Sequence, residues 1–134
     1  ADAASQGTGS ARRRLAKFVQ VSLEPPVTSH TSVAIWAGFF EVLLHDPGMK
    51  ASHNRSYNKL RLHLKTLIRD LFDETGRIAN DDQLRHLSIA GNAVLDGLWL
   101  EGGALAEVFR EGELVQVGLD SFSALLGVDL KAQD

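Results

Sequence analysis

Residues 33–44 read VAIWAGFFEVLL, a stretch that is apolar on every side when it is wound into an α-helix. Serine and threonine residues before it can cap a helix, and Pro47 after it favours a break. The predicted helix therefore runs from about Ser29 or Thr31 to His45. Because a surface helix keeps one polar face, we expect this one to be buried in the middle of the domain.

Helical periodicity continues on both sides of this stretch. We find no convincing alternation of apolar and polar β-branched residues, which half-buried strands would show. The predicted helices cover about residues 10–23, 29–45, 48–72, 80–104 and 111–126. The expected fold is therefore all-α, an antiparallel helical bundle of about five helices.

Composition limits the possible classes of protein. The chain has 134 residues, of which 44% are hydrophobic, so it can form one domain with a sizeable core. It has no cysteine, which excludes disulfide-stapled folds and zinc ribbons. No apolar run reaches the roughly 18 residues of a membrane span, and the N-terminus lacks the apolar stretch of a signal peptide. We therefore expect a cytoplasmic protein that does not contact a membrane.

The charge balance argues against DNA binding by this chain alone. Its net charge is −3 and its pI is about 5.9. A module that grips nucleic acid by itself usually has a basic face and a high pI. Any DNA contact is therefore expected from residues outside this sequence.

Two segments together resemble a known family. AIWAGFF at residues 34–40 is followed by LHDP at 44–47, and AVLDGLWL stands at 93–100. Their order, spacing and helical context resemble the C-terminal regulatory domain of TetR-family transcriptional repressors. They are most similar to the branch containing the choline-responsive repressor of betaine synthesis. Phe40 stands where that branch often has a second tryptophan.

The resemblance spans about residues 10–126 and implies helices five to nine of a nine-helix protein. Family members begin with roughly 50 residues that hold a helix-turn-helix, which this sequence lacks. Residues 1–9 are then a linker remnant or disordered, and residues 10–134 are the ligand-binding and dimerisation domain. The implied function is to sense a small molecule, choline or another amine, and to dimerise so that the missing domain is positioned on operator DNA. A ligand-free helical interaction module is the alternative.

Aromatic and acidic residues form the candidate ligand site. Aromatic walls hold apolar groups and attract quaternary ammonium ions through cation–π contacts, although aromatic side chains also fill ordinary cores. Asp96 lies in an apolar stretch, where a carboxylate must be solvated, paired or neutralised. It is either a counter-charge for a cationic effector or part of a structural hydrogen bond or ion pair to a neighbouring helix. Arg61, His63 and His53 are candidate partners. The candidate ligand-binding residues are Trp36, Phe39, Phe40, Tyr57, Asp96 and Trp99.

The last two helices are the candidate dimer interface. In the family that the chain resembles, helices eight and nine of two subunits form a four-helix bundle. Glycine inside a helix costs about 1 kcal/mol relative to alanine, and close approach of helices is the natural compensation. The residues assigned to the dimer face, or to the core beneath it, are Leu84, Leu87, Gly91, Val94, Leu98, Leu114, Val117, Phe122 and Leu125.

Catalytic and metal-binding patterns are missing from the sequence. It has no glycine-rich phosphate loop, nucleophile elbow or paired-acid motif. His53 and His63 are about 15 Å apart along a helix, too far to share a metal ion. We therefore expect no enzyme activity, no cofactor and no metal.

Overall fold

The computed structural model describes residues 9–25 and 29–132. In these residues the chain forms helices and no strand, so the all-α prediction is confirmed. The expectation for residues 1–9 falls, apart from Gly9, outside the described residues. The helices are α2 (Ala11–Ser22), α3 (His30–His45), α4 (Pro47–Glu74), α5 (Asp81–Ala104) and α6 (Glu113–Leu126), with a short 3-10 turn, η1 (Ala106–Val108), between the last two.

Local sequence signals explain where the helices begin and end. The Ser10 hydroxyl accepts a hydrogen bond from the Arg13 amide at 3.1 Å and caps α2. Asn80 and Gln83 form a reciprocal capping box at the start of α5, with distances of 2.8 and 2.9 Å. Gly127 ends α6 with a φ of 68°, a left-handed conformation that favours glycine. The predicted helix boundaries agree with these to within a few residues.

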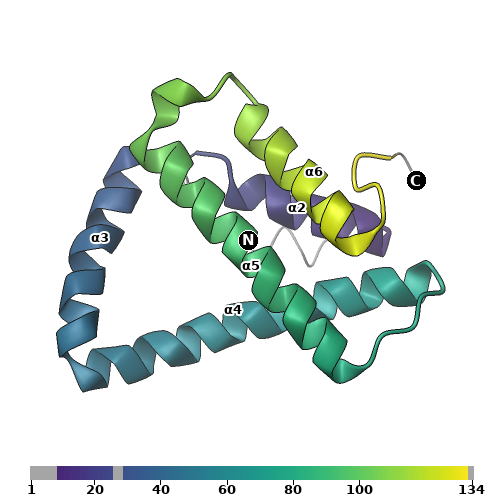
Figure 1. The fold of residues 1–134 in the computed structure, drawn as a ribbon, viewed down its shortest axis with the longest axis horizontal. Helices are drawn as coiled ribbons and strands as arrows, with labels where there is room; N and C mark the ends of the chain where they lie inside the picture. Colours follow the sequence, from purple (N-terminus) through teal and green to yellow (C-terminus); the bar gives the residue numbers. More distant parts are fainter. Residues whose placement is uncertain (1–8, 26–28, 133–134) are drawn as a thin grey trace.

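Figure 1 shows how the helices are arranged. Helices α3, α4 and α5 form the three sides of a triangle, and α2 and α6 lie together on the other side of α5. The main core joins α2, α5 and α6 to the C-terminal half of α4. None of the described helices is both long and apolar enough to cross a membrane.

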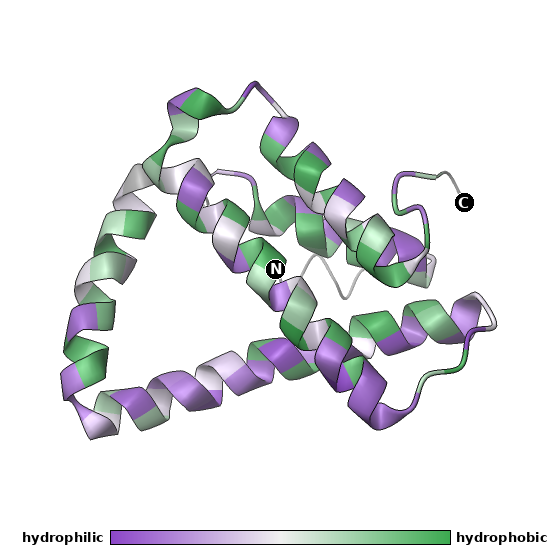
Figure 2. Ribbon diagram, viewed as in Figure 1, coloured by the Kyte–Doolittle hydropathy of each residue, from purple (hydrophilic) through white to green (hydrophobic). Residues whose placement is uncertain are grey.

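The predicted burial of the apolar helix α3 is wrong. Only Val33 and Leu43 are buried among its large apolar residues, and neither belongs to the main core. Ile35 is 67% exposed and Leu44 is 71% exposed. Figure 2 shows apolar positions along this helix at the edge of the molecule. Its main neighbours are α4 and α5, and the apolar side chains that face away from them are exposed in the protomer.

The structure separates the residues that the sequence assigned to a dimer face or the core beneath it. Leu84, Gly91 and Phe122 are buried in the protomer core. Val117 is 38% exposed and so is not part of the protomer core. The remaining members are half-buried against the core: Leu87, Val94, Leu98, Leu114 and Leu125.

Candidate ligand-binding site

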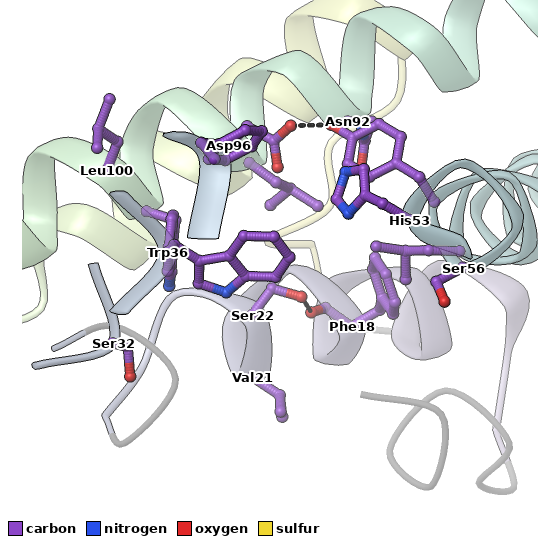
Figure 3. Close-up of a pocket in the computed structure, with 15 residues that line it drawn as sticks. Phe18, Val21, Ser22, Ser32, Trp36, His53, Ser56, Asn92, Asp96 and Leu100 are labelled. Atoms are coloured by element: carbon purple, nitrogen blue, oxygen red, sulfur yellow. Dashed lines mark hydrogen bonds between the residues drawn. The ribbon is translucent and has the colours of Figure 1, made fainter. Parts of the chain in front are cut away.

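A cavity of about 720 Å³ lies where α2, α3, α4 and α5 meet. Figure 3 shows side chains from all four helices around it. Its volume falls in the range of about 300–1,000 Å³ that is typical of small-molecule sites. The lining residues are Phe18, Val21, Ser22, Ser32, Trp36, Phe40, His53, Ser56, Tyr57, Leu60, Asn92, Leu95, Asp96, Trp99 and Leu100.

Five of the six candidate ligand residues line this cavity. They are Trp36, Phe40, Tyr57, Asp96 and Trp99. Phe39 does not line it and instead lines a smaller cavity of about 350 Å³ between α3 and α4. Phe39 and Phe40 are neighbours in sequence, but a helix turns by about 100° per residue, so their side chains face different spaces.

Trp36 is the centre of the aromatic wall. Its ring centroid lies 5.5 Å from that of Phe40 and 6.3 Å from that of Trp99, so it connects α3 to α5. The Trp36–Trp99 pair meets edge to face, with an interplanar angle of 88°. This geometry is favourable for aromatic rings and leaves ring faces available to other groups. The wall can therefore contact apolar groups or an organic cation.

Asp96 has a hydrogen-bond partner on a neighbouring helix. The Tyr57 hydroxyl donates a hydrogen bond to Asp96 Oδ2, which joins α4 to α5. This is a structural hydrogen bond to a neighbouring helix, one of the two interpretations given for Asp96, although its donor, Tyr57, was not among the suggested partners. The side chain of Asp96 is exposed toward the cavity that it lines, so its carboxylate can also meet a ligand.

The surroundings of Tyr57 favour its neutral form. Burial is the main factor that raises the pKa of Tyr57, and the hydrogen bond and negative charge of Asp96 raise it further. A hydrogen bond with Asn92 and the positive charge of Arg61 oppose the shift. The Arg61 guanidinium lies 5.1 Å from the centroid of the Tyr57 ring, outside the residues that line the cavity.

The raised pKa of Tyr57 leads to a test. The chain has a single tyrosine, so phenolate absorbance follows this group alone. We expect the midpoint to lie above the ordinary value of about 10. Since the folded pKa is raised, the Tyr57–Asp96 bond contributes to stability below about pH 10 and is lost as pH rises through the raised pKa.

An Asp96→Asn variant provides the control for this titration. Its midpoint should fall, because the hydrogen bond and negative charge of Asp96 no longer raise the pKa of Tyr57. An unchanged midpoint in the variant would mean that Asp96 does not interact with Tyr57 in solution.

Several cavity residues were missed by the sequence interpretation. His53 lies one helical turn before Tyr57, and Asn92 lies one turn before Asp96, so the i, i+4 spacing could have indicated both. Phe18, Val21 and Ser22 of α2 carried no such signal, because nothing in the sequence shows that α2 crosses the end of this cavity. Among residues 9–25 and 29–132, no group of three histidine or acidic side chains is placed to hold a metal ion.

Comparison with known proteins agrees with this architecture. Residues 11–127 match the family model described as the C-terminal domain of BetI-type transcriptional repressors, within the TetR group. The chain belongs to this family. The TetR-family resemblance stated from the sequence is therefore confirmed. No curated protein sequence matches the chain at a significant level.

The TetR-type architecture is also found in a solved structure. The chain is similar to the crystal structure of a candidate transcriptional regulator from Pseudomonas aeruginosa PAO1, with 27% sequence identity and a TM-score of 0.84. The match covers 94% of the present chain and 60% of that protein. The present TetR-type domain thus spans less than two thirds of the length of this relative.

Proposed function

We propose that residues 10–134 are the regulatory domain of a TetR-type repressor and bind a small-molecule effector in the cavity between α2, α3, α4 and α5. The domain also dimerises and so positions a DNA-binding part that is not included in this sequence. The proposed location of the protein is the cytoplasm. The observation that carries the proposal is a cavity of about 720 Å³ that combines an aromatic wall with one carboxylate. A ligand-free interaction module would need no such space, so the cavity favours effector binding.

The charge of the cavity favours an organic cation as the effector. Among the described residues that line it, Asp96 has the only carboxylate, and none is lysine or arginine. Trp36 and Trp99 line the same cavity as this carboxylate, so a cation bound there can contact both an indole ring and Asp96. Choline, which the family resemblance suggests, is the first compound to test. The size of the cavity also admits amines with larger apolar groups.

Helices α5 and α6 carry the surface that we propose for dimerisation. Leu87, Val94 and Gly97 follow one another at helical spacing along α5, and Leu114 and Val117 do so on α6. These side chains are half-buried or exposed in the protomer. A Cβ atom built on Gly97 would meet nothing within 4 Å, so the backbone of a second copy can approach closely there. Two such helix pairs would form a four-helix bundle.

The position of α3 suggests how binding would be transmitted. This helix supplies Trp36 and Phe40 to the cavity but is anchored by only two buried large apolar side chains. An effector bound between Trp36 and Trp99 would fix α3 against α5, which carries the proposed dimer surface. A ligand shifts a conformational equilibrium by the difference in its affinity for the two states. The spacing of the two DNA-binding parts would change accordingly.

Binding can be measured without a label. The chain has two tryptophans, and both line the cavity. We expect choline or hexyltrimethylammonium to change tryptophan fluorescence in a saturable way. We expect Asp96→Asn to weaken binding about tenfold, because it removes the negative charge that attracts the cation and interactions with a charged group contribute about 1.5–3 kcal/mol.

Two controls separate charge from shape in this experiment. Glu41→Gln removes a carboxylate from the exposed side of α3, next to Phe40, and should leave the affinity unchanged. The neutral carbon isostere of choline, with carbon in place of the ammonium nitrogen, should bind weakly to the wild type and equally weakly to Asp96→Asn. Equal affinity of the wild type and Asp96→Asn for the cation would contradict the proposed role of Asp96.

A further inference from the structure

A second, smaller cavity adjoins the main cavity, and the rings of Trp36 and His53 line both. The smaller cavity, of about 350 Å³, lies between α3 and the start of α4. Trp36, His53 and Ser56 line both cavities, whereas Phe39, Met49 and Ser52 line only the smaller one. The two spaces are therefore separated by shared side chains rather than by backbone.

His53 is the central part of this separation. Its ring centroid lies 5.5 Å from that of Trp36, which comes from the opposite helix. It also lies 5.3 Å from the ring of Tyr57 and 5.8 Å from that of Phe40, on the side of the main cavity. On the side of the smaller cavity it lies 6.0 Å from Phe39. Figure 3 shows both His53 and Trp36 among the side chains that line the main cavity.

The composition of the smaller cavity indicates what could enter it. Besides the shared residues, its lining consists of an aromatic ring, a thioether and a small hydroxyl. It has no charged group among its described lining residues, so it suits the end of an apolar chain rather than a second ionic group. Methionine adapts to apolar groups of varied shape because its side chain is flexible and polarizable.

We propose that the Trp36–His53 contact is a partition that sets the maximum length of the effector's apolar part. This inference rests on the proposed function, because it assumes that the effector's cationic group lies at Asp96. The effector is then a cationic amphiphile whose tail runs along the aromatic wall and ends at His53. Removal of the His53 ring joins the two cavities and admits a longer tail. His53 is thus a specificity-determining residue and not the main source of affinity.

The test uses n-alkyltrimethylammonium ions of increasing chain length, below their micelle concentrations, with tryptophan fluorescence as the readout. In the wild type, affinity should rise about fourfold for each methylene group that is buried and then stop rising at a limiting length. In His53→Ala the rise should continue for at least two more methylene groups. Alanine suits this position because it is the strongest helix former.

Two further variants sharpen the result. His53→Phe keeps a ring between the cavities and should keep the wild-type limit, which separates loss of the ring from loss of the imidazole. Met49→Ala enlarges only the smaller cavity. As a single substitution it should leave the limiting chain length unchanged, and combined with His53→Ala it should extend that length further. Thermal unfolding of each variant, followed by circular dichroism, verifies that it is folded before titration.

The outcomes distinguish the inference from the function on which it rests. Binding by the wild type with the same limiting length in His53→Ala would overturn the partition and leave the effector site intact. Binding by the wild type without any limiting length would overturn it in the same way. Failure of every ion in the series to bind the wild type would overturn the proposed function together with the partition.

Discussion

Replacing Phe122 with alanine is expected to lower the free energy of unfolding by about 3–5 kcal/mol, the usual cost of deleting a buried phenylalanine. The ring of Phe122 is 0% exposed and lies in the core that joins α2, α4, α5 and α6. It fills the space beside Gly91, where an added Cβ atom would lie 2.9 Å from Phe122 Cε1 and 3.4 Å from Leu64 Cδ2. Chemical denaturation measures the loss.

A double-mutant cycle tests the same contact more selectively. Gly91→Ala should gain about 1 kcal/mol of helix propensity but lose about 1–3 kcal/mol by overpacking against Phe122. In a Phe122→Leu background the ring atoms are gone, so the same change should become neutral or stabilising. Effects that add to within about 0.5 kcal/mol would show that Gly91 and Phe122 do not pack against each other.

Substitution of Gly97 by glutamate is expected to separate the proposed dimer without unfolding the protomer. The site is open in the protomer, so the new side chain meets no neighbour there. In the proposed dimer it would bring a carboxylate from each subunit into the interface, and such like-charge contacts cost several kcal/mol. We expect the dissociation constant to rise at least about 100-fold. Sedimentation equilibrium should then report a mass of 14.6 kDa rather than twice that value.

Gly38 offers a matched control on another helix. It also lies within a helix, and a Cβ atom built there meets nothing within 4 Å. Gly38→Glu therefore adds the same charge to the outer face of α3 and should leave the dimer intact. If Gly38→Glu dissociates the dimer and Gly97→Glu does not, the apolar outer face of α3 is the interface and the assignment to α5 and α6 is wrong.

Much of the fold could be predicted from local signals in the sequence. The Asn80 cap and the glycine after α6 act within a few residues of themselves, so they indicate helix ends without knowledge of the tertiary structure. The burial of α3 could not be predicted in this way. Apolar composition indicates that burial of a helix is favourable, but it does not show whether the residues that cover the helix belong to the same protomer.

The candidate site could be predicted in part. Trp36 and Asp96 stood out because an aromatic cluster and a carboxylate in an apolar stretch are each unusual in a helix. Their convergence depends on how α3 and α5 cross, which helical periodicity does not encode. Tyr57, as the partner of Asp96, and Phe18, at the α2 side of the cavity, likewise depend on packing between helices that are distant in sequence.

The central claim is that the cavity between α2, α3, α4 and α5 is the effector site, and the two indole N–H groups of the chain test it most directly. A nitrogen–proton correlation spectrum should contain one indole signal from Trp36 and one from Trp99, since these are the only tryptophans in the sequence. Titration with hexyltrimethylammonium is predicted to move both signals with one common dissociation constant. Binding that stabilises the protein while leaving both indole signals in place would contradict the claim.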